Sequence, residues 1–382
     1  MKIAFLLQDT RSLYGAEQAT VQLLASLTAA GLAAHVVLLQ ETRLGAGGSP
    51  LADALRQVAP VHSIPVAGRF SRSAVAQIRE IMARERCDVL HSTGYKADWH
   101  ALLASRRASL FPVVSTVHGW LFRWQPKERF FQALNIRALR QFSRVVVLSQ
   151  FYERYLRRCG LGPLQLAHIP TGICPERVVG RAVAQELWDA PGEMFTFGML
   201  GRLSSEKDHR LLLRAVRRLA RDLDTSPRSW RILIAGDGPL RGALQRQIAR
   251  WGLRDRVELA GWLPAAEFFA RTHILVQCSR VENQPLSVME AMAWMRPVLA
   301  TRAGGLPELV ADGETGALVR RSARALAAAM RHYLAAPTKA RADGIRARDR
   351  LEQHYAVEPM IRDHIGLYAT VRASWNTPDN VS

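Results

Sequence analysis

The sequence predicts an α/β protein with two consecutive domains, each built on a parallel β-sheet. Three observations lead to this prediction. Short apolar runs alternate with amphipathic helical stretches in the first half, the alternation stops over Thr171–Pro191, and it starts again at Phe195. Apolar strands that alternate with helices are typical of parallel sheets whose two faces are both covered.

The first half contains six apolar runs that we expect to be strands. A helix is expected over Glu17–Ala29, where leucines recur on one side and Gly31 gives a stop signal. The six expected strands are Ile3–Leu7, His35–Leu39, Val61–Ile64, Val89–His91, Val113–Val117 and Val145–Leu148.

The second half repeats the pattern after a stretch that has no clear period. We interpret that stretch as the connection between domains, so the predicted domains are residues 1–185 and 186–357. A last helix is expected over residues 358–375, roughly. The five strands expected in the second half are Phe195–Gly201, Arg231–Ala235, Val257–Ala260, Ile274–Gln277 and Val298–Ala300.

Length and composition fit a globular protein with two complete cores. The 382 residues are 48% hydrophobic and 22% charged. The net charge of +19 suggests an anionic partner, which is a nucleic acid, an acidic membrane surface or a phosphorylated ligand. Four scattered cysteines favour reduced thiols in the cytoplasm. We expect neither a signal peptide nor a membrane span.

Two glutamates flank the expected start of a helix in the second domain. Glu282 precedes Pro285, which can open a helix, and Glu290 lies within that helix. The two carboxylates suit sugar and ribose hydroxyls, and the helix N-terminus between them suits phosphate. Acidic residues are also common near helix starts for electrostatic reasons alone.

Basic and glycine-rich loops follow three of the predicted strands in the second domain. Arg202 and Lys207 follow the first strand and can neutralise a diphosphate, although Lys207 could instead begin a solvated helix face. Gly236 allows either close approach of a ligand or a tight turn. Gly304 and Gly305 offer backbone amides for an anion or hydroxyl.

The first domain carries two further candidates. Gly15 follows the first strand and opens a helix, so it could cradle a phosphate, but the spacing does not support a dinucleotide fingerprint. His118 ends another strand and can hydrogen-bond a sugar. His91 has a similar position, and a lone histidine is more often structural. No metal site is predicted, because no Asp-x-Asp run lies beside a predicted strand and no His-x-x-x-His spacing occurs.

Together these segments resemble the family 4 glycosyltransferases, a large retaining group with the GT-B architecture. The matching pieces occur in the family's order and cover most of the chain. They are Gly-Ala-Glu17, Thr-Val-His118-Gly, Gly201-Arg-x-x-x-x-Lys207, Gly236-Asp-Gly-Pro, Glu282-x7-Glu290 and Gly304-Gly-x-Pro-Glu.

The resemblance implies two Rossmann-like domains whose parallel sheets face a central cleft. The N-terminal domain would bind the acceptor, the C-terminal domain would bind the nucleotide-sugar, and the last helix would pack back on the N-terminal domain. Asn283 stands where the family often has Gly. A side chain therefore enters that loop, and the identity of the donor sugar stays open.

The resemblance also assigns roles at the site. Arg202 and Lys207 would hold the diphosphate, Glu290 the ribose, and Glu282 and His118 the donor sugar; His118, Glu282, Arg202 and Lys207 form the expected catalytic set. The remaining residues of the expected donor site are Gly15, Gly236, Leu286 and Ser287. No metal or cofactor is expected besides a UDP- or GDP-sugar as co-substrate, because fixed cations and the helix N-terminus replace the metal.

Fixed cations would stabilise the charge that develops on the leaving diphosphate. In the family, the leaving phosphate is thought to accept the acceptor's proton on the same face, which retains the anomeric configuration without an enzymic base.

Residues 126–144 read as an amphipathic helix with arginines between the apolar positions. The apolar positions are Phe130, Phe131, Leu134, Ala138 and Phe142, and Trp120, Leu121, Phe122 and Trp124 precede the helix. Such a helix could lie on an anionic membrane. Alternatively, the apolar stripe is core and the arginines are solvated.

The sequence therefore predicts a retaining glycosyltransferase that transfers sugar to a glycan or glycolipid in bacterial surface polysaccharide or lipopolysaccharide synthesis. It would be cytoplasmic or peripheral on the inner face of the plasma membrane. One alternative is a GT-B sugar-nucleotide epimerase, which would bind the donor without transfer. Another is a non-catalytic basic binder of membrane or nucleic acid, although no nucleic-acid motif supports it.

Overall fold

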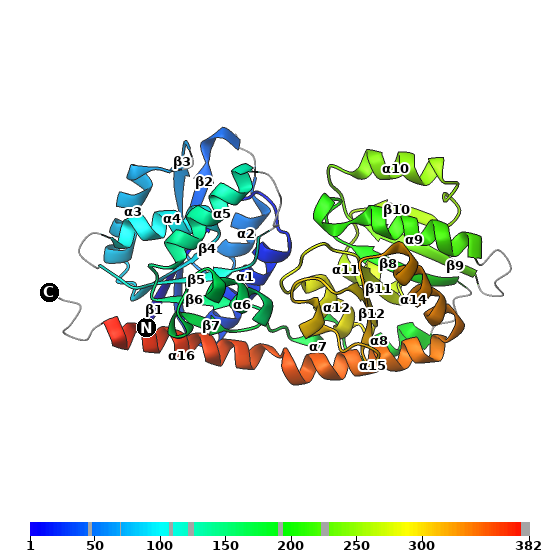
Figure 1. The fold of residues 1–382 in the computed structure, drawn as a ribbon. Coiled ribbons are helices and arrows are strands. Elements are labelled where there is room, and N and C mark those ends of the chain that lie inside the picture. Colours follow the sequence, from blue (N-terminus) through cyan, green and yellow to red (C-terminus); the bar gives the residue numbers. More distant parts are fainter. Residues whose placement is uncertain are drawn as a thin grey trace. The chain divides into compact units, whose positions relative to one another are not determined.

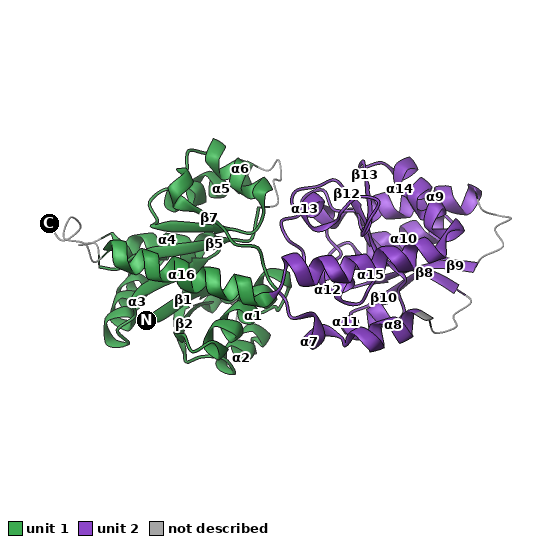
Figure 2. Ribbon diagram, turned by 90° about the horizontal axis from the view of Figure 1, so that it is seen from below, with its two compact units in different colours: residues 1–172, 357–382 green, residues 173–356 purple. Residues whose placement is uncertain are grey.

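The computed structural model describes residues 1–44, 48–68, 70–106, 110–120, 126–189, 194–222 and 229–375. The chain divides into unit 1, Met1–Gly172 with Val357–Ser382, and unit 2, Ile173–Ala356 (Figure 2). The predicted boundary after residue 185 is therefore wrong. The segment predicted as a connection instead forms helices α7 (Pro175–Val178) and α8 (Arg181–Asp189) of unit 2.

Unit 1 contains a parallel sheet in the order β3-β2-β1-β4-β5-β6-β7 within the described residues (Figure 1). All six predicted strands are present, and a short seventh was not predicted. The strands are β1 (Lys2–Gln8), β2 (Ala33–Glu41), β3 (Val61–Val66), β4 (Val89–Thr93), β5 (Val113–Val117), β6 (Arg144–Val147) and β7 (Leu166–His168).

Helices cover both faces of this sheet, because alternate residues of each central strand are buried on opposite sides. In β1, Ala4 and Leu6 pack in one core with helices α3 to α6, whereas Ile3 and Phe5 pack in another with α1, α2 and α16. The helices of unit 1 are α1 (Gly15–Ala29), α2 (Pro50–Arg56), α3 (Arg72–Arg84), α4 (Tyr95–Ser105), α5 (Pro126–Leu139), α6 (Gln150–Arg158) and α16 (Val357–Trp375), with 3-10 turns at Thr42–Leu44 and Pro163–Gln165.

Helix α16 joins unit 1 through a buried polar contact. The Tyr368 hydroxyl lies 2.6 Å from His91 Nδ1, and His91 Nε2 lies 2.8 Å from the Thr116 hydroxyl. The ring of His364, also on α16, stacks on that of His91 at 6.2 Å between centroids. Burial lowers the pKa of His91, and it lowers the pKa of His364 to about 4 against the opposing hydrogen bond to the Met360 carbonyl and the charge of Asp363.

The buried histidines should make unit 1 sensitive to acid. A histidine with a folded pKa of about 4 and an unfolded pKa of 6.5 takes up its proton more readily in the unfolded chain. The contribution of this histidine to the free energy of unfolding is therefore complete above pH 6.5. It is lost as the pH falls towards 4, by an amount on the order of 3 kcal/mol. Urea unfolding at pH 7.5 and at pH 5 measures the free energy of unfolding. Between these two pH values it should fall less for His364→Gln than for the wild type. The exposed His168 provides the control His168→Gln, whose loss should match the wild type.

Unit 2 contains a parallel sheet in the order β10-β9-β8-β11-β12-β13 within the described residues. The five predicted strands are present, and β13 was not predicted. The strands are β8 (Met194–Leu200), β9 (Ser229–Ala235), β10 (Val257–Gly261), β11 (Ile274–Gln277), β12 (Val298–Thr301) and β13 (Gly316–Val319).

The core of unit 2 includes the apolar sides of α9, α10 and α14, where Leu212, Leu244 and Met330 are buried against the strands. Besides α7 and α8, the helices are α9 (His209–Asp222), α10 (Arg241–Arg250), α11 (Ala265–Ala270), α12 (Leu286–Ala293), α13 (Leu306–Leu309), α14 (Ala323–Ala335) and α15 (Pro337–His354), with a 3-10 turn at Ser205–Lys207.

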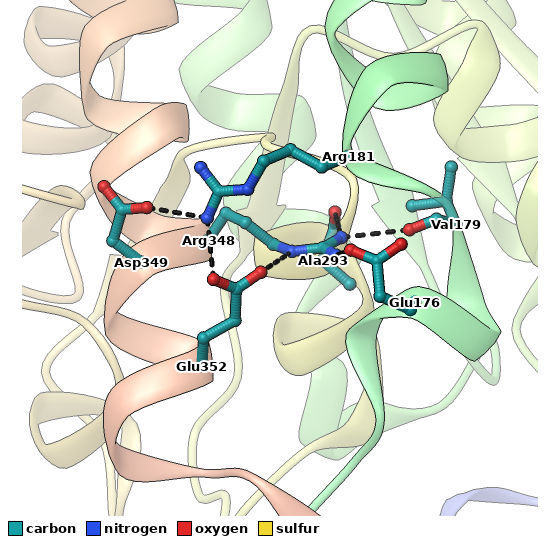
Figure 3. A network of polar contacts seen from close by, with 7 residues as sticks. All are labelled: Glu176, Val179, Arg181, Ala293, Arg348, Asp349 and Glu352. Atoms are coloured by element: carbon teal, nitrogen blue, oxygen red, sulfur yellow. Dashed lines mark hydrogen bonds and ion pairs between the residues drawn. The ribbon is translucent and has the colours of Figure 1, made fainter.

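A buried arginine ties three helices of unit 2 together (Figure 3). Arg348 on α15 is fully buried, and its Nη1 donates to the carbonyls of Ala293, at the end of α12, at 2.6 Å and of Val179 at 3.1 Å. Its Nε donates to Glu352 at 2.6 Å, and its Nη2 pairs with Glu176 on α7. The partly exposed Arg181 on α8 joins the cluster through Glu352 and Asp349.

Helix α5 ends at Leu139, five residues before the predicted end at residue 144. Ala138 and Phe142 of the apolar stripe are buried in the core of unit 1, so that part of the membrane interpretation is wrong. Phe130 is 62% exposed. The half-buried Trp120 packs inside the unit, and Leu121, Phe122 and Trp124 lie outside the described residues. Within the described ranges, no helix is both long enough and apolar enough to cross a membrane.

Candidate functional site

The strand order of unit 2 reverses between β8 and β11. Ligands of open parallel sheets bind beyond the carboxyl ends of the strands at such a reversal. Arg202 and Lys207 lie in the loop after β8, and Glu282 lies in the loop after β11. The topology therefore brings the predicted cations and the first predicted glutamate to one edge of one sheet.

Lys207 and Glu282 are in direct contact. Lys207 Nζ lies 2.6 Å from Glu282 Oε1, and the same oxygen accepts hydrogen bonds from Ser279 Oγ at 2.6 Å and Gln277 Nε2 at 2.8 Å. Both side chains of the ion pair are mostly buried, at 19% and 13% exposure. Three donors on one oxygen fix the orientation of the Glu282 carboxylate, because each restricts a different direction of movement.

Asp208 fixes the end of the cationic loop. It has a left-handed backbone with φ of 53°, and its carboxylate pairs with Arg321 at 2.7 Å and Arg280 at 3.3 Å. Lys207 thus has a fixed backbone position at the end of the 3-10 turn, while Arg202 is exposed at the start of the loop.

Two glycines let the loops of the site approach one another. A Cβ at Gly236 would lie 2.1 Å from the carbonyl oxygen of Gly201, and a Cβ at Gly304 would lie 1.8 Å from that of Glu282. Gly305 N–H also donates to the Glu282 carbonyl at 3.1 Å. Gly236 therefore allows the loops after β8 and β9 to pack closely. Of the two roles predicted for it, this agrees with a tight turn rather than with direct contact to a ligand.

Helix α12 begins at Leu286, one residue later than predicted, with Pro285 at the N-cap. Leu286 and Ser287 are its first two residues, whose amides have no acceptor within the helix. Glu290 lies in the second turn, and burial raises the pKa of its carboxyl group. Within the described residues, its carboxylate has no hydrogen bond or ion pair. A half-buried carboxylate without a partner is typical of a ligand site.

Unit 1 also has a reversal of strand order, between β1 and β4. A cavity of about 230 Å³ opens there, lined by side chains that include Glu17, Tyr95, His118 and Trp120. Gly15 is the first residue of α1, and a Cβ at this position would meet no atom within 4 Å. The aromatic and polar lining suits a sugar, which offers both C–H faces and hydroxyl groups.

His118 follows β5 and lines this cavity. Its Nε2 lies 3.3 Å from the Thr20 hydroxyl on α1, and burial lowers the pKa of the imidazole to about 4. The ring is therefore neutral near pH 7, with one donor and one acceptor nitrogen. His91 differs from it, because both of its nitrogens already have partners in the core.

The structure thus places the predicted residues in two groups. Arg202, Lys207, Gly236, Glu282, Leu286, Ser287 and Glu290 lie at the switch point of unit 2, and Gly15 and His118 lie at that of unit 1. Sequence reasoning missed Gln277 and Ser279, which hold Glu282. Their place at the carboxyl end of β11, directly before the Glu282 loop, was the signal available.

Two family models match successive parts of the chain. Residues 14–177 match the family described as Glycosyltransferase Family 4, and residues 195–336 match Glycosyl transferases group 1. A GDP-mannose-dependent alpha-(1-6)-phosphatidylinositol monomannoside mannosyltransferase of Mycolicibacterium smegmatis is 30% identical over 276 residues, 66% of this chain and 68% of that protein.

Two further relatives are also named as sugar transferases. The UDP-Gal:alpha-D-GlcNAc-diphosphoundecaprenol alpha-1,3-galactosyltransferase of Escherichia coli is 23% identical over 64% of this chain and 66% of its own length. The lipopolysaccharide core biosynthesis mannosyltransferase LpcC of Rhizobium leguminosarum is 30% identical over 42% of this chain. The match spans 47% of LpcC, which is less than half of that relative.

Solved structures share the whole fold. The crystal structure of Anabaena Alr3699/HepE in complex with UDP and glucose has a TM-score of 0.80 and 23% identity, and covers 97% of this chain and 100% of HepE. A sucrose-phosphate synthase from Thermosynechococcus elongatus has a TM-score of 0.79 and 22% identity, with 98% of this chain and 100% of that one covered.

Proposed function

The chain belongs to the family 4 glycosyltransferases and has their GT-B fold, and we propose that it moves a sugar from a nucleotide-diphosphate sugar to a glycan or glycolipid with retention of configuration. One observation carries the proposal. The Lys207–Glu282 ion pair and the unpartnered Glu290 carboxylate flank the N-terminus of α12 at the switch point of unit 2. The cations and the helix N-terminus suit a diphosphate. The two carboxylates on either side suit the hydroxyl groups of a sugar and of a ribose.

We assign the charge stabilisation to Arg202 and Lys207, together with the first amides of α12 at Leu286 and Ser287. The bond between the anomeric carbon and the phosphate oxygen breaks, and the diphosphate takes the electron pair. Positive groups held in place before the reaction stabilise that charge in the transition state. For retention, the acceptor oxygen forms the new bond to the anomeric carbon on the face that the phosphate leaves, the leaving phosphate oxygen takes the acceptor's proton, and no metal takes part.

Glu290 is assigned to the ribose hydroxyls, and Glu282 and His118 to the donor sugar. Because Oε1 of Glu282 already accepts three donors, its Oε2 is left to accept a sugar hydroxyl. A neutral His118 imidazole can donate to one hydroxyl or accept from it.

A donor screen tests this proposal. Purified protein is heated with UDP-, GDP-, ADP- and CMP-sugars, and one nucleotide class should raise the melting temperature. Glu290→Ala and Arg202→Ala should weaken binding by at least about tenfold, because each removes a charge-assisted hydrogen bond. The controls Glu314→Ala and Arg210→Ala, at exposed positions of unit 2, should bind as the wild type does.

The outcomes separate the competing functions. Binding without transfer to any acceptor, but with an altered sugar in the recovered nucleotide, would identify an epimerase. No shift with any donor, together with salt-sensitive binding of nucleic acid, would replace the proposal by a basic binder. Transfer that continues in EDTA would support a reaction without a metal. A product that has the donor's anomeric configuration by NMR would support retention.

We propose that the acceptor is a glycolipid or glycan of the bacterial surface and that the protein works at the cytoplasmic face of a membrane. The names of the three relatives above point to lipid-linked or lipopolysaccharide acceptors. The N-terminal part of α5 in unit 1 supports a membrane contact. Phe130 is 62% exposed beside the exposed Lys127 and Arg129, and the chain carries +19 charges. Exposed aromatics next to cations favour an interface with anionic lipid.

Co-sedimentation with vesicles that contain phosphatidylglycerol tests the membrane contact. Phe130→Ser should lower the partition constant of the protein between water and vesicles by roughly tenfold, since burying a Phe side chain contributes ~1.5–3 kcal/mol. Leu164→Ser, at an apolar position of unit 1 that is 84% exposed, is the control and should bind as before. Equal binding of all three proteins would remove α5 from the interface.

A further inference from the structure

Two histidines and a glutamate meet in unit 1 at the end of the sheet opposite the candidate site. His35 lies near the start of β2 and His62 near the start of β3, the edge strand, whereas Glu85 caps the C-terminus of α3. All three side chains are mostly buried, at 14%, 21% and 23% exposure. The candidate glycosyl-transfer residues follow the carboxyl ends of strands, so this cluster is separate from them.

The three side chains have the spacing of ligands around one small cation. His35 Nδ1 and His62 Nε2 are 3.0 Å apart, and their distances to the Glu85 carboxylate are 3.8 Å from His35 Nε2 and 3.9 Å from His62 Nε2. One ligand atom from each residue can be chosen so that all lie within 4.8 Å of one another. Ligands at 2.0–2.2 Å from a tetrahedral zinc ion are ~3.3 Å apart. Small side-chain rotations therefore suffice.

The ligand types select among metals. Two imidazoles with one carboxylate suit Zn²⁺ and other late transition metals, whereas Mg²⁺ and Ca²⁺ prefer oxygen ligands throughout. Arg84 competes with a metal ion for these side chains, because its guanidinium lies 3.0 Å from Glu85 and 3.4 Å from His62. Its side chain is 54% exposed and can turn into solvent when a metal arrives.

We propose that His35, His62 and Glu85 form a zinc site, with water as the fourth ligand. The ion would join two neighbouring strands, one of them the edge strand β3, to the end of α3. Its role is to stabilise unit 1, because no candidate group for sugar transfer lies at this end of the sheet. The site is independent of the proposed glycosyl transfer, which we expect to proceed without a metal.

Zinc binding is tested on the full chain without a histidine tag, after treatment with EDTA and its removal. Isothermal titration with ZnCl₂ should give one high-affinity site per chain. Zinc at a hundredfold excess over its Kd should raise the melting temperature by roughly 5–10 °C. His62→Gln and Glu85→Gln should lose the high-affinity site and the shift, whereas His332→Gln, an exposed position in unit 2, should keep both.

Glu85→Gln keeps the imidazole pair, so its melting temperature without metal should stay near that of the wild type. This variant therefore distinguishes loss of binding from loss of folding. Its affinity for the nucleotide-sugar should also be unchanged, which separates this site from the donor site. No stoichiometric binding by the wild type, or undiminished binding by both variants, would overturn the proposal.

Discussion

Replacing Lys207 with methionine is expected to lower kcat for sugar transfer by about 10²–10³-fold, the usual loss when one fixed donor to a developing anion is removed. Lys207 is the cation whose position is set both by the 3-10 turn and by its contact with Glu282 at 2.6 Å. Because the charge on the diphosphate grows as the bond breaks, KM for the donor should change less than kcat. Steady-state kinetics with saturating acceptor measure both constants.

Arg210→Met is the matched control for this variant. It removes a positive charge from the exposed side of α9, three residues along the chain, without touching Glu282. Its kcat should equal that of the wild type, because exposed charges at a distance are screened by salt. A similar loss in both variants would mean that net charge, rather than the position of the Lys207 ammonium, determines the rate.

A second large effect is expected on stability. Arg348→Met should destabilise unit 2 by about 3–5 kcal/mol, because it leaves two buried carbonyls without a donor, and each unsatisfied buried group costs ~1–3 kcal/mol. The Ala293 and Val179 carbonyls would lose their hydrogen bonds, and Glu352 would lose one of its two arginines. The melting temperature of that unit should fall by roughly 6–20 °C.

Arg181→Met tests whether burial causes this effect. Arg181 also pairs with Glu352, but its side chain is 40% exposed, so its loss should cost below about 1 kcal/mol. Differential scanning calorimetry of both variants gives the comparison. Equal destabilisation by the two substitutions would show that the ion pairs, rather than the buried carbonyls, hold the network together.

Most of the fold follows from local sequence patterns. Long buried strands such as β1 and β8 were predicted because several consecutive apolar residues are covered on both faces. β7 and β13 were missed because neither is a run of buried apolar residues: β7 has three residues and ends in the exposed His168, whereas β13 begins with a glycine and alternates buried with half-buried residues. The start of unit 2 was missed for another reason. Helices α7 and α8 are held by partners distant in sequence, Arg348 for α7 and the pair Asp349 and Glu352 for α8, and not by a strong period of their own.

The candidate site shows the same division. Arg202, Lys207 and Glu290 belong to motifs and could be predicted together with their place after strands. The three donors on Glu282 could not, because only the pairing of β8 with β11 brings Lys207 and Gln277 to one oxygen. The zinc ligands gave no signal, since His35 and His62 are 27 residues apart and meet through strand register.

Helix α16 gives unit 1 an unusual order of synthesis. The strands of this unit are translated early. Tyr368, whose hydroxyl contacts His91, is translated only after all of unit 2. Until then, the face of β1 and β4 that α16 covers is open on the nascent chain, with Phe5 and Val89 among its buried residues. Unit 2 is one uninterrupted segment and can complete its core first. The unit whose translation starts first is therefore the last to finish folding.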